Sequence, residues 1–365
     1  MKLICDKNLL STAANHISRV VSNKTPMAAL SGILLTAKNN SLTLSGYDLE
    51  IGMRTEIPAA VEEGGNAVLE AKIFCDIVKR LPEDKVVITV DERNLCHITS
   101  GKAAFSLIGV NADEYPELPN VEKGASVIIS ASIIESMVRQ TIFAVAEAGG
   151  PKPILSGIHF IIRDGELKMV AVDGYRIAIR SEKVAVDGDI EFTVPAKTMS
   201  EVLKLMGEDG DITLHASDRH IIFDVEGYKV ISRLLEGDFF DYKRAVPDKF
   251  LTVVRGNTSD LTRTIERISQ VIIERLKTPI VCDFNEGVFH ASCMTEIGQA
   301  QDEMNIEMEG ENLKIGFNSK YLLDALRAAE TDEVLIKMVS PLSPISIMPV
   351  KGDNFIFIVL PVKIR

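Results

Sequence analysis

The sequence contains no tryptophan, and aromatic residues make up only 5% of its 365 positions. Proteins that hold single-stranded nucleic acid stack its bases on aromatic side chains, and this composition provides no such surface. The five cysteines are scattered and form no CxxC pair, which argues against a disulfide framework or a cysteine-rich zinc site. We therefore expect reduced thiols and no structural metal.

Motifs for nucleotide binding and catalysis are missing as well. The chain has no GxxxxGK[ST] loop, GxGxxG turn, GxSxG elbow or HExxH helix. No stretch approaches the roughly 18 apolar residues that cross a bilayer, and Asp6 interrupts the apolar run that a signal peptide needs. We expect a cytoplasmic, non-catalytic protein without a metal or a cofactor.

Acidic residues outnumber basic ones by 52 to 40, which gives a net charge of −12. Hydrophobic residues at 46% and charged residues at 25% are typical of a soluble globular protein. The length predicts two or three domains. The net charge alone argues against a nucleic-acid coat, which usually has a basic footprint.

An internal repeat is visible at a constant spacing. The letters LSGI occur at 30–33 and again at 155–158, 125 residues apart. Asp48 and Asp173 keep this spacing, and so do the AK pairs that open the stretches at 71 and 196. Three markers in one register indicate two copies of one module.

A third copy is fainter. SKYLLDAL at 319–326 has the pattern of the stretches that begin at 71 and 196, and TPIVCDF at 278–284 stands where the second LSGI segment would fall. Proline-bearing links at 114–124 and 238–249 separate the copies. The sequence thus predicts three domains, at 1–120, 125–246 and 248–365.

Each copy combines alternating strand patterns with two short amphipathic stretches, which predicts helices packed on antiparallel sheet in an α+β fold. The expected helices span 7–21, 71–80, 130–148, 197–206, 258–276 and 319–330. These helices hold 13 basic and nine acidic residues, whereas the rest of the chain holds 27 and 43. If all helices face one way, a mildly basic surface is backed by a strongly acidic one.

A weakly basic face suits a protein that stays on DNA and still moves along it. Each neutralised phosphate adds salt-dependent affinity, so a mobile protein should make few such contacts and be retained by a closed ring. Helices that cross phosphates without reading bases would contact DNA independently of its sequence.

The residues resemble the bacterial sliding clamp family, the β subunit of DNA polymerase III. The likeness rests on the opening MKLICDKNLL, both LSGI turns, VAVDGYRI at 170–177, EGDFFDYKRAVP at 236–247 and the terminal IVLPVKIR. It implies a processivity factor: a head-to-tail homodimer of six domains that encircles duplex DNA. Its partners would be the replicative polymerase, the clamp loader and other proteins that carry clamp-binding peptides.

The resemblance also implies a partner-peptide pocket between the second and third modules. Apolar residues edged by Arg176 and Arg244 would suit a short peptide with aliphatic or aromatic anchors. Phe240 stands where the family commonly has proline, and Tyr175 where a histidine can stand. The implied pocket residues are Leu155, Val172, Gly174, Tyr175, Arg176, Ile177, Phe240, Arg244, Ala245, Val246, Leu342, Pro344, Val359, Leu360, Pro361, Val362 and Lys363.

Candidate residues can also be named for DNA contact and for a subunit seam. The family has a basic residue in the loop that holds Lys24, and helix position alone suggests Arg19, Lys72, Lys79, Arg139, Lys197, Lys204, Arg263, Arg267 and Lys320. At the seam a basic and apolar edge of the first module would meet an acidic edge of the third. The seam candidates are Lys102, Phe105, Leu107, Ile272, Ile273, Glu296 and Glu303.

Two other functions remain open from the sequence. The acidic run from Asp302 to Glu311 could hold a divalent metal in an enzyme, although a solvated or partner-facing strand edge is the simpler interpretation. A peptide-binding scaffold that never encircles DNA is the other alternative.

Overall fold

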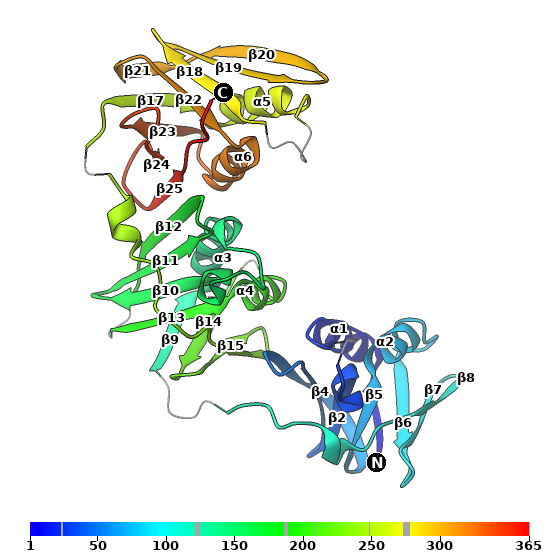
Figure 1. Ribbon diagram of the computed structural model, residues 1–365. Coiled ribbons are helices and arrows are strands. Elements are labelled where there is room, and N and C mark those ends of the chain that lie inside the picture. Colours follow the sequence, from blue (N-terminus) through cyan, green and yellow to red (C-terminus); the bar gives the residue numbers. More distant parts are fainter. Residues whose placement is uncertain are drawn as a thin grey trace. The chain divides into compact units, whose positions relative to one another are not determined.

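The computed structural model describes residues 1–22, 25–120, 125–185, 189–207, 209–247, 249–272 and 278–364. The chain forms two compact units (Figure 1). The N-terminal unit comprises Met1–Ser132 and Lys197–Leu234, and the C-terminal unit comprises Ile133–Ala196 and Leu235–Arg365. The second module is therefore divided between the two units.

The helices are short and begin directly after strands. In the described ranges they are α1 (Lys7–Ser18), α2 (Ala71–Lys79), α3 (Ala131–Arg139), α4 (Ala196–Leu203), α5 (Thr258–Ser269) and α6 (Ser319–Ala328). Carboxylate or amide side chains of the preceding residues accept hydrogen bonds from the first turns of four of them. α1 and α2 lie side by side, as do α5 and α6 (Figure 1).

A sheet of 12 strands forms the framework of the N-terminal unit. Its main path runs β8-β7-β6-β1-β4-β16-β15-β14-β9, and β3 joins it at β4 and leads on through β2 to β5. The strands are β1 (Lys2–Asp6), β2 (Gly32–Lys38), β3 (Ser41–Tyr47), β4 (Ile51–Glu63), β5 (Gly65–Glu70), β6 (Lys85–Val90), β7 (Leu95–Ser100), β8 (Ala103–Ile108), β9 (Ala125–Ser130), β14 (Asp211–Ala216), β15 (His220–Val225) and β16 (Tyr228–Arg233).

The C-terminal unit has a sheet of nine strands and one of four. The larger runs β13-β10-β11-β12-β25-β24-β23-β17-β21 and the smaller β20-β19-β18-β22. Their strands are β10 (Gly157–Arg163), β11 (Glu166–Val172), β12 (Arg176–Lys183), β13 (Ile190–Pro195), β17 (Thr252–Asn257), β18 (Ile280–Asn285), β19 (Val288–Thr295), β20 (Gly298–Asn305), β21 (Glu307–Gly310), β22 (Leu313–Phe317), β23 (Glu333–Met338), β24 (Ile345–Pro349) and β25 (Phe355–Val359).

Successive modules are joined edge to edge by antiparallel strands. β4 of the first module pairs with β16 of the second, and β12 of the second pairs with β25 of the third. Equivalent strands make both junctions, since β4 and β12 begin 125 residues apart. In the third module β20 corresponds to β4 and β12, and in the first module β8 corresponds to β16 and β25. Neither has a second neighbour in the described part of this chain, because both are edge strands of their sheets.

Close backbone packing explains why the LSGI motif recurs. A Cβ atom on Gly32 would lie 2.8 Å from the carbonyl oxygen of Leu69, and one on Gly157 would meet the carbonyl oxygen of Val194. These contacts involve backbone, which cannot move aside as a side chain can. The repeated glycine is therefore a packing requirement of the sheet.

We expect Gly157→Ala to lower the free energy of unfolding by about 2–3 kcal/mol, because the added methyl overpacks the β10–β13 pair. Gly207→Ala is the control, since its Cβ would meet only the movable carboxylate end of the Glu226 side chain, at 3.3 Å, and it should change stability by less than about 0.5 kcal/mol. Urea unfolding followed by circular dichroism measures both. Equal stabilities would contradict the steric explanation.

The expected helix over 130–148 is wrong beyond Arg139. The Thr141 hydroxyl donates to the carbonyl oxygens of Met137 and Val138, at 2.8 and 3.3 Å, and the chain turns into a short 3-10 helix at Ile142–Ala144. Such back-bonding by threonine competes with the regular helix ladder. The helix expected at 258–276 ends at Ser269, and residues 273–277 lie outside the described part.

All five cysteines are free, and four are buried. Cys282 and Cys293 belong to the core of the third module, where they pack as small apolar side chains. Burial raises the pKa of Cys5 and of Cys96 to about 12. It also raises the pKa of the other three thiols.

Candidate functional site

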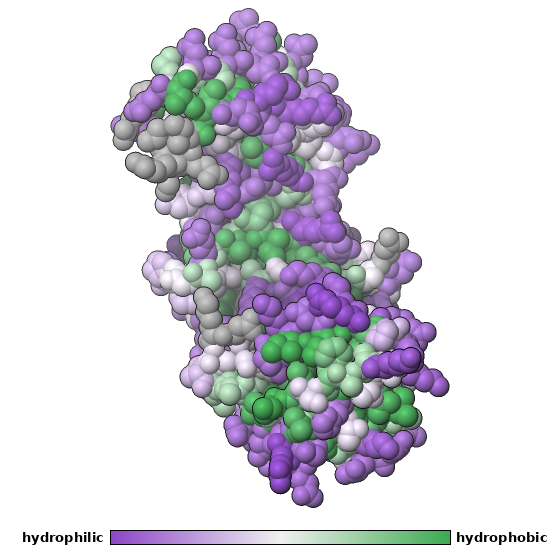
Figure 2. All heavy atoms as spheres, turned by 90° about the vertical axis from the view of Figure 1, so that its right-hand side faces the viewer, coloured by the Kyte–Doolittle hydropathy of each residue, from purple (hydrophilic) through white to green (hydrophobic). Residues whose placement is uncertain are grey.

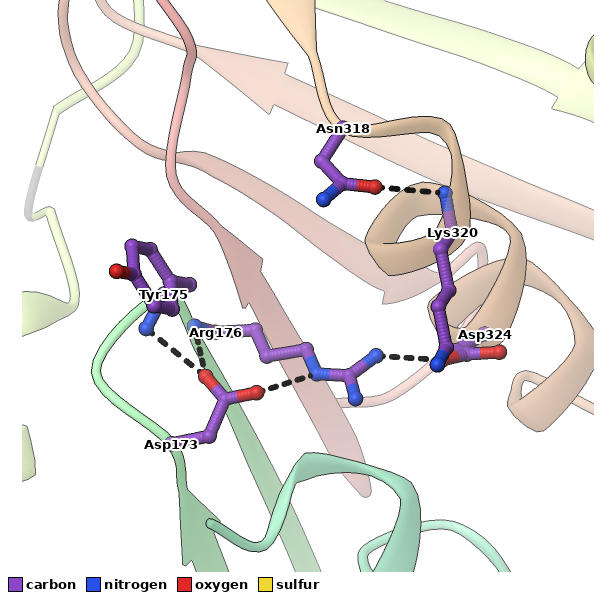
Figure 3. Close-up of polar contacts among 6 residues, drawn as sticks. All are labelled: Asp173, Tyr175, Arg176, Asn318, Lys320 and Asp324. Carbon is purple, nitrogen blue, oxygen red and sulfur yellow. Dashed lines mark hydrogen bonds and ion pairs between the residues drawn. The ribbon is translucent and has the colours of Figure 1, made fainter. Parts of the chain in front are cut away.

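A tight turn between β11 and β12 organises the predicted pocket. The Asp173 Oδ1 atom accepts hydrogen bonds from the backbone N–H groups of Tyr175 (2.8 Å) and Arg176 (3.0 Å) (Figure 3). Gly174, between them, has a φ of +91°, a conformation that glycine adopts without a steric penalty. The turn therefore fixes where β12 begins.

Arg176 is held by two carboxylates. Its Nε donates to the Asp173 Oδ2 at 2.8 Å and its Nη1 to the Asp324 Oδ2 at 2.6 Å (Figure 3). The guanidinium carbon lies 4.6 Å from the centre of the Tyr321 ring and 5.4 Å from that of Phe143. The side chain is 9% exposed, so it ties the second module to α6 of the third.

A small apolar cluster lies on the sheet at the junction of β12 and β25. We call it the junction cluster; its buried members are Val170, Val172, Ile177, Ile179, Tyr242 and Ile358, and Leu155, Ile161, Phe239, Ala245, Val246 and Ile356 pack against them. Five residues of the predicted pocket meet here: Leu155, Val172, Ile177, Ala245 and Val246. They come from the second LSGI turn, the Asp173 turn and the link between modules.

The chain after β25 continues past this turn. The Leu360 N–H donates to the carbonyl oxygen of Tyr175 at 2.9 Å, and the Val362 N–H donates to that of Gly316 at 2.7 Å. Tyr175 is 59% exposed and stacks on Tyr321 with 5.7 Å between ring centres. The exposed Tyr175, the half-buried Tyr321 and the terminal segment thus lie beside the buried arginine.

The remaining predicted pocket residues differ widely in exposure. Val359 is fully buried in the core of the third module, whereas Leu342 is 81% exposed. Arg244 is open to solvent and pairs through its Nε with Asp241 at 2.9 Å. Pro344, Leu360 and Pro361 are half-buried, and Phe240, Val362 and Lys363 are exposed.

Sequence reasoning missed both partners of Arg176 and several apolar residues. Asp173 was used only to align the repeats, and Asp324 is 148 residues from the arginine. Ile179 could have been found, because it is two positions beyond Ile177 on a strand and so lies on the same face. Ile358, opposite Ile177 on β25, depends on a pairing between modules that no local pattern marks.

A cavity of about 390 Å³ opens beside the junction cluster, where the link crosses the sheet. His159 lies on its floor, with Nδ1 2.9 Å from the Thr193 hydroxyl, Nε2 2.9 Å from the Glu191 carboxylate, and its ring stacked on Phe239. Burial lowers the pKa of His159 although Glu191 acts in the opposite direction. No motif in the sequence indicates this cavity.

Comparison with known proteins covers the whole chain. Three family models match in order: the N-terminal, central and C-terminal domains of the DNA polymerase III beta subunit, over residues 1–119, 128–241 and 243–363. The chain belongs to the DNA polymerase III beta subunit family.

Individual relatives agree with the family models. The beta sliding clamp of Staphylococcus epidermidis is 32% identical over 375 residues, which cover 100% of this chain and 99% of that protein. Among solved structures, a putative DNA polymerase III beta subunit from Eubacterium rectale matches with a TM-score of 0.96 and 34% identity over 99% of each chain. The DNA polymerase sliding clamp of Bacillus subtilis matches with a TM-score of 0.97 and 28% identity over 100% of each chain.

Family membership confirms the resemblance and the α+β fold of three tandem clamp modules. As a member of this family, the chain is a processivity factor of DNA replication and not an enzyme. None of the helices in the described ranges has the length and apolar character that crossing a bilayer requires.

The basic residues assigned to DNA contact in this clamp chain are exposed wherever the structure describes them; Lys24 lies outside the described residues. Several are already paired, as Lys197 is with Asp48 at 2.5 Å and Arg267 with Asp302 at 2.6 Å. Arg139 and Arg263 pair with carboxylates on their own helices, and Lys204, which follows α4, pairs with Glu201 on that helix. Arg19, Lys72, Lys79 and Lys320 form no ion pair with another described residue.

The seam candidates lie on or near the two free edges. Phe105 and Leu107 belong to β8, which Lys102 precedes, and Glu303 belongs to β20. Glu296 is in the turn before β20, and Ile272 lies half-buried beyond α5. Ile273 is outside the described residues.

The acidic run on β20 and β21 shows no metal-binding arrangement. Alternation along β20 turns Asp302 toward Arg267 and leaves Glu303 exposed. Across the described ranges, no three His, Cys, Asp or Glu side chains are grouped closely enough to hold an ion.

Proposed function

We propose that two copies of this chain close head to tail into a ring of six modules around duplex DNA. Both junctions within the chain join the strand in the β4 position to the strand in the β16 position. In the third module β20 corresponds to β4, and in the first module β8 corresponds to β16; both are edge strands. β20 of one copy could therefore pair with β8 of the other as these strands pair within the chain. This repetition carries the proposal, because a heterologous contact that closes on itself makes a ring.

The chemistry of the two edges is complementary. β8 exposes Phe105 and Ile108, at 38% and 85%, and Lys102 precedes it. β20 carries Glu303, and the exposed Met294 and Ile297 lie just before it. Apolar contact with opposite charges around it would favour both affinity and register. With modules at 1–120, 125–246 and 248–365, β8 belongs to the first module and β20 to the third. Each terminal module therefore carries one of the two edges.

We further propose that the basic helix surfaces contact the DNA backbone without reading its sequence. Cationic side chains that touch phosphates give affinity that falls with salt and does not depend on the bases. Arg19, Lys72, Lys79 and Lys320 are the strongest candidates, since each is exposed and unpaired within the described ranges. The paired cations can add to them, and Lys24 remains a candidate from the resemblance. The protein would act in the cytoplasm.

We assign the partner-peptide site to the junction cluster and its surroundings. Leu155, Ala245 and Val246 offer partly buried apolar surface over a buried floor, and Tyr175 with Val362 lies beside the adjoining turn. Such a groove accepts aliphatic or aromatic anchors of an extended peptide. Clamp-binding peptides of the polymerase and the clamp loader are the expected occupants.

Opening the ring needs a separate ATP-driven loader, since the chain has no nucleotide motif.

Retention on closed DNA tests the ring. The chain, loaded on nicked circular plasmid by the loader, should stay bound through gel filtration and be released when the plasmid is linearised. Sedimentation equilibrium should give a dimer. A stable monomer, or equal retention on both DNA forms, would refute the ring.

Charge placed in the groove should abolish peptide binding and leave the dimer intact. We expect Leu155→Asp with Val362→Asp to weaken binding of a clamp-binding polymerase peptide at least 30-fold, about 2 kcal/mol, because apolar anchors lose their contact surface. Fluorescence anisotropy measures the affinity, with Leu251→Asp, an exposed apolar residue outside the groove, as the control. Unchanged affinity would remove these residues from the site.

A further inference from the structure

A second cavity, of about 560 Å³, lies in the N-terminal unit, where the link at 115–120 crosses the sheet face turned away from α1. Its lining corresponds by position to that of the cavity beside the junction cluster. The matching residues, each 125 positions apart, are Leu34 and His159, Thr36 and Ile161, Thr43 and Lys168, Tyr115 and Phe240, and Leu118 and Lys243. The first junction therefore repeats the architecture of the second.

The floors of the two junctions differ in charge. On the second, Ile179 of β12 lies opposite Ile356 of β25, and both belong to the junction cluster. On the first, Arg54 of β4 lies opposite Lys229 of β16. Like charges directly opposite on neighbouring strands destabilise a sheet, so this pair costs stability unless an anion lies between the two cations.

Intramolecular carboxylates neutralise the two cations only weakly. The Arg54 side chain is exposed and makes no hydrogen bond or ion pair within the ranges that the structure describes. Lys229 pairs with Asp224 at 3.9 Å, and both side chains are largely exposed, at 58% and 41%. Glu117 is the acidic residue among those that line the cavity.

The walls beside these cations are apolar. Leu34 and Leu118 pack on the cluster formed by Ala29, Leu30, Tyr47, Val68 and Tyr115, and Ile222 and Ile231 line the side toward β15 and β16. Aliphatic walls next to a pair of cations fit a carboxylate with a neighbouring aliphatic side chain. They suit nucleic acid less well, because Tyr115 is buried and offers no face for stacking.

We propose that this groove is a second docking site, which binds an extended acidic segment of a partner protein. A carboxylate of that segment lies between Arg54 and Lys229, and an adjacent aliphatic side chain packs against Leu34 and Leu118. The site is separate from the peptide site assigned to the junction cluster and does not depend on it.

A random octapeptide library displayed on phage, panned against the full chain carrying Leu155→Asp, tests the proposal while the other site is disabled. Peptides with Asp or Glu next to Leu, Ile or Val should be enriched. The most enriched sequence, made synthetically, should bind at least tenfold more weakly to Arg54→Glu with Lys229→Glu than to the parent, by calorimetry.

Two further variants make the result decisive. Lys38→Glu with Lys85→Glu reverses the same charge on the same unit outside the cavity and should change the affinity less than twofold. Arg54→Gln with Lys229→Gln adds no repulsion and should still weaken binding at least threefold, with circular dichroism confirming the fold. Enrichment without acidic residues, equal losses in the control, or displacement of the peptide by a DNA dodecamer would overturn the proposal.

Discussion

Phe105→Glu with Ile108→Glu should convert the dimer into monomers and abolish retention on circular DNA. Both side chains are exposed on the free edge strand β8, and in the ring they would face the acidic strand β20. Two new carboxylates would remove apolar contact and add repulsion. We expect a loss of about 3 kcal/mol or more, which raises the dimer dissociation constant at least 100-fold.

Sedimentation equilibrium measures this change, and gel filtration of the loaded plasmid measures its consequence. Leu251→Glu is the matched control, because Leu251 is 58% exposed and belongs to neither edge. It should leave both the dimer and the retention unchanged. If the double variant still sediments as a dimer, the seam lies elsewhere on the chain.

Arg176→Met should destabilise the C-terminal unit by about 3–5 kcal/mol. The substitution keeps much of the side-chain volume but leaves Asp173 and Asp324, with side chains 12% and 23% exposed, without their cation. Removing one partner of a buried ion pair strands the other charge in a poorly solvated position. Urea unfolding of the intact chain, followed by circular dichroism, should show this unit unfolding at lower denaturant.

Two further variants separate the charge effect from packing. Arg263→Met removes an exposed arginine that pairs with Asp260 only at 3.9 Å, and it should change stability by less than about 0.5 kcal/mol. Adding Asp173→Asn and Asp324→Asn to Arg176→Met should recover much of the lost stability, because neutral amides need no counter-charge. A triple variant as unstable as Arg176→Met would assign the loss to packing.

The modular fold could be predicted because its strongest constraint is local. Gly32 and Gly157 each face a neighbouring backbone at the start of a strand, so both copies keep the same letters. The third copy has Ile280 at the corresponding strand start, and its repeat was visible only as a pattern. The helix expected after β9 extends to residue 148, whereas α3 ends at Arg139, because its end depends on back-bonding by Thr141 that a periodic pattern does not record.

Motifs predict which residues form the candidate site. The contacts that hold these residues together appear only in the structure. The resemblance implies Val172 and Ile177 as pocket residues, but their meeting with Leu155 and Val246 depends on contacts between distant segments. Arg176 was expected at an open edge of the groove; its burial against Asp324 depends on the fold of the third module. The like-charge pair of Arg54 and Lys229 needs the register of β4 on β16, which no single-strand pattern fixes.

The shielded thiols make this chain a convenient subject for covalent chemistry. Because burial raises the pKa of all five, almost none is in the reactive thiolate form at neutral pH. A cysteine introduced on an exposed strand would therefore react with a maleimide dye or a bifunctional cross-linker well ahead of the native ones. Fluorophores and staples can thus be positioned without first engineering a cysteine-free background.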